Sequence, residues 1–275
     1  MKKVPLSKGI FLLPSLFTTA GMFFAYFSII RSINGDYVTA AWAIFLASFF
    51  DLIDGRVARM TKTQSEFGKE YDSLVDLSSF GLAPALLIYT YSLSAFKPIG
   101  WFLSFMYFAC VALRLARFNV RIHVVEKKKF QGLPSPLGAN LLASLVIFLH
   151  TYVGEEMIRN YAAAVVTPVV ALLMVSSIGY RSFKEYDLKK SNSFHFLLGV
   201  ACFLGLVAIN PEIVLFFGIG LYVISGPMGW IISLYLKKKA GVPVKVRTRG
   251  RKFSVVKIPS RAEARQVSED IHAKQ

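Results

Sequence analysis

Four aspartates lie in two pairs within stretches that are otherwise apolar enough to cross a membrane. The pairs are Asp51 with Asp54, and Asp72 with Asp76. An Asp at the centre of a transmembrane helix is unfavourable by about 2.5–3.5 kcal/mol, so four of them require compensation. A bound cation is the obvious candidate for the compensating charge, and carboxylate oxygens suit hard divalent ions such as Mg²⁺ and Mn²⁺. The spacing therefore predicts a metal site in a membrane domain.

Helical periodicity places each acidic pair on one face of its helix. Residues three or four positions apart are neighbours on a helix surface, so Asp51 and Asp54 share one face, and Asp72 and Asp76 share another. The connection between the two helices is short, which predicts a helical hairpin whose acidic faces meet near the connection. Two facing pairs of this kind make an oxygen-rich cage.

Small residues and one arginine lie between the acidic pairs. Gly55, Ala58 and Gly68 leave room for a ligand to approach the backbone, and Arg59 lies near a helix end, where a guanidinium suits phosphate contact. A cation-coupled transporter would also place acids in a membrane. That alternative does not explain the glycines, the alanine and the arginine between them.

The composition excludes an ordinary soluble domain, because 55% of the 275 residues are hydrophobic and 14% are aromatic. Apolar stretches of about 20 residues recur along the chain. They predict an all-α integral membrane protein of about eight transmembrane helices, with a polar metal site near the cytoplasmic side. The expected spans are 11–31, 37–58, 72–92, 98–118, 137–153, 160–180, 194–210 and 212–236.

Positive charge sets the expected orientation. The net charge is +16, and with eight alternating spans most Lys and Arg outside the helices fall on the side of the N-terminus. The positive-inside rule then predicts a multi-pass protein of a bacterial or archaeal cytoplasmic membrane, with both termini and the active site cytoplasmic. Anionic lipids account for the excess charge, so it does not indicate a nucleic-acid partner.

Composition also suggests three regions. Residues 1–10 form a basic, interfacial N-terminal segment, residues 11–236 form one membrane domain, and residues 237–275 form a basic cytoplasmic tail. Within the tail, residues 244–258 alternate weakly between apolar and basic types.

The complete acidic pattern resembles the signature of the CDP-alcohol phosphatidyltransferase family. The matching string is Asp51-x-x-Asp54-Gly55-x-x-Ala58-Arg59, eight further residues, and Gly68-x-x-x-Asp72-x-x-x-Asp76. The resemblance implies a two-metal centre, with Mg²⁺ or Mn²⁺ held by all four aspartates. It further implies that Asp76 is the general base that takes the proton of an acceptor alcohol. The residues implied to contact the CDP-lipid donor are Gly55, Ala58, Arg59 and Gly68.

Two later segments resemble the phosphatidylserine synthase branch of that family: the helix end at 112–119 and the loop at 130–136. This implies transfer of the phosphatidyl group from CDP-diacylglycerol to L-serine with release of CMP, a reaction of phospholipid biosynthesis. It also implies a homodimer and contact with membrane lipids. The implied acceptor-binding residues are Arg114, Arg117, Asn119 and Ser135. By charge alone arginine binds a carboxylate or a phosphate, so glycerol 3-phosphate and inositol phosphate stay open as acceptors.

The first span also resembles this branch, through residues 13–19. Ser15 stands where the family commonly has Asn. Serine keeps an oxygen but lacks the amide, so no ligand role is carried over to that position.

Overall fold

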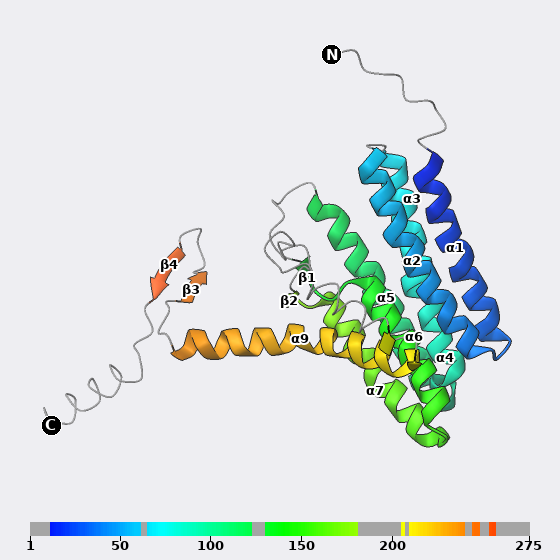
Figure 1. Ribbon diagram of the computed structural model, residues 1–275. Coiled ribbons are helices and arrows are strands. Elements are labelled where there is room, and N and C mark those ends of the chain that lie inside the picture. Colours follow the sequence, from blue (N-terminus) through cyan, green and yellow to red (C-terminus); the bar gives the residue numbers. More distant parts are fainter. Residues whose placement is uncertain are drawn as a thin grey trace, which may run out of the picture. The chain divides into compact units, whose positions relative to one another are not determined.

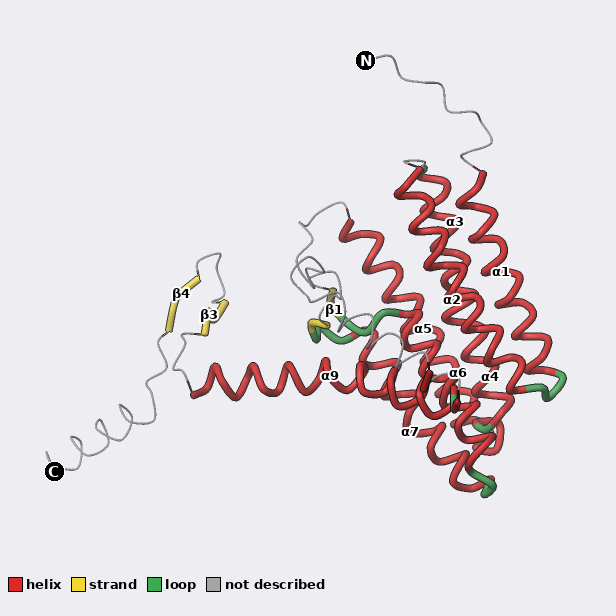
Figure 2. The backbone as a smooth tube through the Cα atoms, in the orientation of Figure 1, coloured by secondary structure: helices red, strands yellow, loops and turns green. Residues whose placement is uncertain are grey.

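The computed structural model describes residues 12–61, 65–122, 130–180, 205–206, 209–239, 244–247 and 253–256. Almost all of them are helical (Figure 2). The helices are α1 (Leu12–Ile33), α2 (Tyr37–Thr61), α3 (Glu66–Asp76), the π-helix η2 (Leu77–Leu82), α4 (Ala83–Tyr91), the 3₁₀ helix η3 (Leu93–Phe96), α5 (Pro98–Ile122), α6 (Ser135–Tyr152), α7 (Glu156–Val175) and α9 (Pro211–Lys239). Two short antiparallel pairs complete the structure: β1 (Phe130–Gln131) with β2 (Gly179–Tyr180), and β3 (Val244–Arg247) with β4 (Phe253–Val256).

Within the described residues, seven helical segments are long and apolar enough to cross a membrane. They confirm the integral membrane class and correspond to seven of the eight expected spans. They are Pro14–Ile33, Tyr37–Thr61, Glu66–Tyr91, Pro98–Val120, Ser135–Tyr152, Glu156–Val175 and Pro211–Ile232. The other expected span, 194–210, lies almost entirely outside the described residues.

The third span begins six residues earlier than the apolar pattern suggests. Ser65 caps α3, since its hydroxyl accepts a hydrogen bond from the Gly68 backbone N–H at 3.0 Å. The polar first turn of α3 is therefore continuous with the helix that carries Asp72 and Asp76. The three consecutive elements α3, η2 and α4 form one unbroken helical rod.

α1, α2 and α3 lie side by side (Figure 1). The C-terminal end of α2, the N-terminal ends of α1 and α3, and the C-terminal end of α5 lie toward the same end of the helix bundle. We call this the α2–α3 end. Both acidic pairs belong to helices that meet there.

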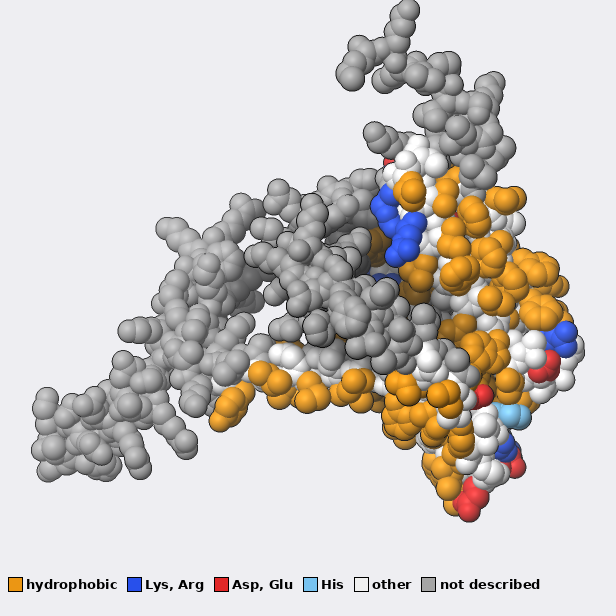
Figure 3. Space-filling model, in the orientation of Figure 1, with side chains coloured by type: hydrophobic (Ala, Val, Ile, Leu, Met, Phe, Trp, Pro, Cys, Tyr) orange, Lys and Arg blue, Asp and Glu red, His pale blue; other side chains and the backbone are white. Residues whose placement is uncertain are grey.

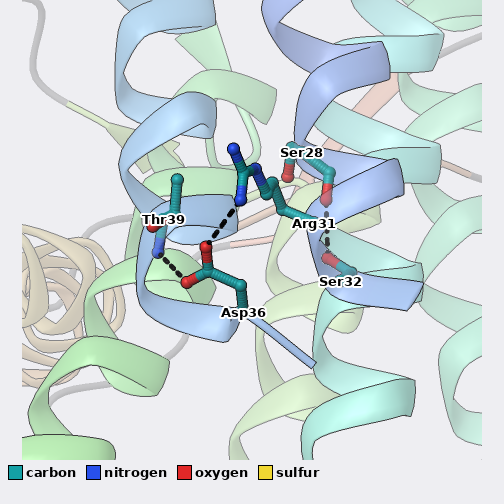
Figure 4. A network of polar contacts seen from close by, with 5 residues as sticks. All are labelled: Ser28, Arg31, Ser32, Asp36 and Thr39. Carbon is teal, nitrogen blue, oxygen red and sulfur yellow. Dashed lines mark hydrogen bonds and ion pairs between the residues drawn. The ribbon is translucent and has the colours of Figure 1, made fainter. Parts of the chain in front are cut away.

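The turn between α1 and α2 is at the opposite end and is held by a polar network (Figure 4). Asp36 accepts a hydrogen bond from the Thr39 backbone N–H at 3.3 Å and so caps α2. The same carboxylate pairs with Arg31 at 3.3 Å, and Ser32 donates to the Ser28 carbonyl at 2.8 Å. These contacts fix the angle at which α2 returns beside α1.

The packed interior is formed by the inner faces of α2, η2, α4, α5, α6 and α7. Fully buried side chains from these elements include Ile44, Phe80, Tyr107 and Leu142. The outer faces carry apolar side chains that the fold leaves exposed, and hydrophobic atoms cover much of the visible helical face (Figure 3). A bilayer accounts for such faces, because lipid tails are as apolar as leucine.

A π-helix follows Asp76 directly. Its wider turn interrupts the regular ladder of hydrogen bonds, and hydroxyl groups of α5 bond to carbonyls of this rod. Tyr107 donates to the Phe80 carbonyl at 2.9 Å, and Ser104 donates to the Ala85 carbonyl at 2.7 Å. π-Turns of this kind occur frequently at functional sites.

The described residues group into two compact units, within 1–223 and within 224–275. In the second unit β3 and β4 form a hairpin in which Val244 lies opposite Val256. The weak alternation of apolar and basic residues in this part of the sequence agrees with strands. The three sequence-based regions, 1–10, 11–236 and 237–275, remain a prediction.

The junction between η3 and α5 depends on Gly100. Gly100 is buried, and a Cβ atom there would overlap the backbone carbonyl of Leu93. Because backbone cannot move aside as a flexible side chain can, we expect Gly100→Ala to destabilise the protein by about 1–3 kcal/mol or more. Thermal unfolding in detergent measures the loss. Gly154→Ala is the matched control, since a Cβ at Gly154 meets nothing within 4 Å; equal melting temperatures for both variants would contradict the prediction.

Candidate active site

All four aspartates line one pocket at the α2–α3 end. Asp51 and Asp54 come from α2, Asp72 and Asp76 come from α3, and Thr18 of α1 completes the wall on that side. One carboxylate oxygen from each of Asp51, Asp72 and Asp76 can be chosen so that all three lie within 4.8 Å of one another. The predicted meeting of the two acidic faces is present.

Asp54 lies in the same pocket but outside this group of three. Its side chain is buried, with 5% of the residue exposed, and it accepts a hydrogen bond from the Thr18 hydroxyl at 2.8 Å. α1 therefore fixes the orientation of one acid of the pair on α2. Hydrogen bonds of this kind, from a group that does not itself contact the metal, commonly orient metal-binding carboxylates.

Two further contacts hold α3 between its neighbours. The hydroxyls of Tyr71 and Thr19 lie 2.9 Å apart, which ties α3 to α1. On the other side the Asn119 amide of α5 donates to the Ser73 hydroxyl at 3.0 Å. Since Tyr71 and Ser73 flank Asp72 in sequence, these contacts fix the part of α3 that presents this acid.

The residues expected to contact the CDP-lipid donor lie at the end of α2 and the start of α3. A Cβ at Gly55 would lie 3.6 Å from a terminal nitrogen of Arg59, so the guanidinium lies over this glycine. Arg59 itself is exposed and Ala58 is half-buried. Gly68 stands at the start of α3, where its N–H is already bonded to Ser65. The four residues thus belong to the C-terminal part of α2 and the first turn of α3.

The residues expected to contact the acceptor divide into two groups. Arg114 donates to the Ser135 hydroxyl at 2.6 Å, and it is close enough to Asp76 for their charges to interact. The Arg114 Nε–H is buried and has no hydrogen-bond partner among the described groups. Arg114 and Ser135 therefore form a hydrogen-bonded pair in which the Arg114 Nε–H stays unsatisfied, although neither residue lines the aspartate pocket.

Arg117 points to a different place. Its guanidinium donates to the carbonyls of Met174 at 3.0 Å and Val175 at 2.8 Å, the last residues of α7. A cation that bonds the final carbonyls of a helix stabilises its C-terminus. Both terminal nitrogens of Arg117, which was predicted to bind the acceptor, are thus hydrogen-bonded to the end of α7.

The loop before α6 packs on the same end of α7. Gly132 has a positive φ of 81°, and a Cβ there would overlap the Met174 carbonyl. Its N–H donates to the Ile178 carbonyl at 2.8 Å, and the N–H of Leu133 donates to the Leu173 carbonyl at 3.1 Å. Only glycine suits this close, left-handed turn, which brings Ser135 to Arg114.

The oxygen atoms that the pocket offers as metal ligands fit a hard divalent cation. It consists of carboxylate oxygens, which are the ligands that Mg²⁺ and Mn²⁺ prefer. Ionised carboxylates this close repel one another in a poorly solvated environment, so a cation between them relieves a strain that the apolar surroundings would otherwise increase. Asp51, Asp72 and Asp76, whose carboxylate oxygens approach within 4.8 Å of one another, could hold such a cation.

Thr18 is a site residue that the sequence did not single out. It lies in the first span, at 13–19, a segment noted only for its resemblance. Threonine in a membrane helix usually bonds to the carbonyl four residues earlier, and Thr18 also has the Pro14 carbonyl at 3.0 Å. No periodicity within one helix reveals a partner that lies 36 positions later.

Known proteins resemble this chain along the helices that build the pocket. The family model described as CDP-alcohol phosphatidyltransferase matches residues 11–177. A Helicobacter pylori protein named CDP-diacylglycerol–serine O-phosphatidyltransferase is 36% identical over 225 residues, which cover 82% of this chain and 93% of that protein. A Mycobacterium leprae protein of the same name is 28% identical over 209 residues, covering 74% of this chain and 69% of the relative.

An archaeal relative aligns over a shorter part. Archaetidylserine synthase of Methanothermobacter thermautotrophicus is 38% identical over 170 residues, which cover 61% of this chain and 69% of that protein. The family model runs from the start of α1 to just beyond the end of α7, and so includes every helix that contributes to the aspartate pocket. With its signature residues gathered in one pocket, this chain belongs to the CDP-alcohol phosphatidyltransferase family.

Proposed function

We propose that this protein transfers the phosphatidyl group of CDP-diacylglycerol to the hydroxyl of L-serine and releases CMP. The observation that carries the proposal is the meeting of both aspartate pairs in one pocket, beside Arg114. The names of the relatives, which include serine O-phosphatidyltransferases of two bacteria, support serine as the acceptor.

Asp51, Asp54, Asp72 and Asp76 would hold two divalent cations, Mg²⁺ or Mn²⁺. When bound, a pair of such ions neutralises the pyrophosphate charge of the donor and stabilises the attacking and leaving oxygens. The carboxylates of this chain would hold the positive charge of the ions at a fixed place in the membrane. Thr18 keeps Asp54 oriented toward the pocket.

The donor headgroup would lie over the hairpin end. Gly55, Ala58 and Gly68 offer little side-chain bulk there, so the CDP group can approach the helix backbone. Arg59 lies over Gly55 and is exposed, which leaves its guanidinium able to contact a phosphate. The apolar outer faces of the same helices would contact the two acyl chains of the donor in the bilayer.

Asp76 would act as the general base. The serine hydroxyl oxygen forms a bond to the donor phosphorus, the bond from that phosphorus to the CMP oxygen breaks, and the hydroxyl proton passes to the Asp76 carboxylate. An alcohol is a weak nucleophile near neutral pH, so a positioned base accelerates this step. CMP leaves with the electron pair of the broken bond.

Arg114 would bind the serine carboxylate. Its Nε–H is a buried donor without a partner among the described groups, and a guanidinium can bind a carboxylate through two parallel hydrogen bonds. Ser135, which accepts from Arg114, fixes the orientation of the guanidinium. Asn119 would line the same side through its bond to Ser73. For Arg117 the proposed contribution is positive charge near the acceptor, in addition to its bonds to α7.

The site would open to the cytoplasm of a bacterial or archaeal cell, with both termini on that side. The positive-inside pattern of the sequence supports this orientation. The resemblance to the family supports a homodimer.

Product identification tests the proposal most directly. We expect purified protein with CDP-diacylglycerol and Mg²⁺ or Mn²⁺ to form phosphatidylserine and equimolar CMP, measured by mass spectrometry. An acceptor panel would include L-serine, glycerol 3-phosphate and inositol phosphate, each with one CDP-lipid. A product from another acceptor alone would overturn the serine assignment, and counterflow of ions without CMP release would indicate a transporter.

A further inference from the structure

The metal pocket has a polar group that neither the signature nor the mechanism uses. Ser79 of η2 lines the pocket together with the aspartates. The residue is 2% exposed, and its Oγ has no hydrogen-bond partner among the described groups. A buried hydroxyl without a partner is unfavourable, so a group that bonds to it on ligand binding contributes stability.

The hydroxyls of neighbouring serines are satisfied within their own helix. Ser73 donates to the Lys69 carbonyl at 3.0 Å, and Ser78 donates to the Leu74 carbonyl at 3.1 Å. This bond to the carbonyl four residues earlier is the usual solution for a hydroxyl in an apolar helix. Ser79, which lines the pocket, does not form this bond.

Ser79 belongs to the part of the pocket beyond the carboxylates. Asp72, Asp76 and Ser79 lie on successive turns of one rod, and on antiparallel α2 Asp51 and then Ala47 lie progressively farther from the hairpin end. Ala47 and Gly21 also line the pocket, and neither has a polar side chain. The part of the pocket farthest from the hairpin end, which we call its floor, is therefore lined by Gly21, Ala47, Ser79 and Phe80, and Ser79 is the polar residue among them.

Other buried polar atoms without a partner among the described groups do not point to this site. Tyr91 Oη and Thr167 Oγ1 share the property, but neither residue lines the pocket. Arg114 Nε is already accounted for by the proposed acceptor. Ser79 alone of these four lines the pocket with the aspartates.

We propose that Ser79 is a positioning residue of the metal centre, whose hydroxyl binds a water ligand of the cation at the floor of the pocket. Mg²⁺ and similar ions usually keep several waters when protein carboxylates bind them. A hydroxyl that orients such a water acts through the cation, and outer contacts of this kind change metal affinity by about 10- to 100-fold. The inference rests on the proposed binding of a divalent cation by the aspartates.

Mn²⁺ binding without substrates tests the inference. The full chain in detergent is titrated with Mn²⁺, and free Mn²⁺ is measured by electron paramagnetic resonance. We expect Ser79→Ala to raise the Kd by about 10-fold or more, and Ser79→Thr, which keeps the hydroxyl beside Gly21 and Ala47, to stay near the wild-type Kd. Ser78→Ala is the matched control, because that hydroxyl bonds within its own helix, and its Kd should stay within about twofold of wild type.

Ser79→Cys covers the case in which Ser79→Ala does not fold, since a thiol has nearly the same shape but is a weak hydrogen-bonding group. It should raise the Kd in the same direction. A wild-type Kd in both the Ala and Cys variants would overturn the role of Ser79 and leave the proposed function intact. If the wild-type protein bound no Mn²⁺, the metal assignment of the aspartates and this inference would both be wrong.

Discussion

Replacing Asp76 with Asn should lower kcat by about 10³-fold or more. The amide keeps the size of the side chain but cannot accept the proton of the acceptor alcohol, and general base catalysis alone contributes about 10²- to 10⁴-fold. Asp76 also lies within 4.8 Å of Asp51 and Asp72, so the substitution removes one negative ligand of the proposed metal centre. CMP release measures the rate, and a separate CDP-lipid binding measurement should show partial retention.

Asp36→Asn is the matched control for this prediction. Asp36 caps α2 at the opposite end of the helix and pairs with Arg31. Asparagine is also a good N-cap, so the variant should fold and turn over within about twofold of wild type. Full activity of Asp76→Asn would show that the base is another group.

Replacing Arg114 with Met should raise the KM for serine by about 10- to 100-fold. A hydrogen bond to a charged group contributes about 1.5–3 kcal/mol, and the Arg114 guanidinium has a buried donor without a partner among the described groups. The KM for CDP-diacylglycerol should change much less, because the proposed donor contacts lie at the hairpin end. Steady-state kinetics with each substrate varied in turn would separate the two effects.

Arg117→Met gives the comparison, three residues away on the same helix. Its guanidinium bonds the carbonyls of Met174 and Val175, so its loss should lower the melting temperature more than it changes the KM for serine. The opposite result, with a large serine effect at Arg117 and none at Arg114, would contradict the assignment of the acceptor carboxylate to Arg114.

Much of the fold could be predicted because membrane helices are local structures. Each span satisfies its own backbone hydrogen bonds and must be apolar over about 20 residues. Seven of the expected spans could therefore be placed to within about six residues. The early start of α3 was missed because its first turn is polar, and the cap that begins it is a contact between Ser65 and Gly68. The π-turn at Leu77–Leu82 has no apolar period of its own.

The two acidic pairs and their chemistry were determined by the sequence alone. The spacings of three and four put each pair on one helix face, and the high cost of acids in a membrane predicted a bound cation. The tertiary structure decided which groups share that site. Thr18 and Arg114 come from α1 and α5, and they lie near the aspartates only because the helices pack together. Ser79 follows Asp76 on the same rod, and helix packing buries its hydroxyl without a partner among the described groups. The same packing turned Arg117 toward α7, because helical periodicity sets the face of a residue but not the neighbour that occupies it.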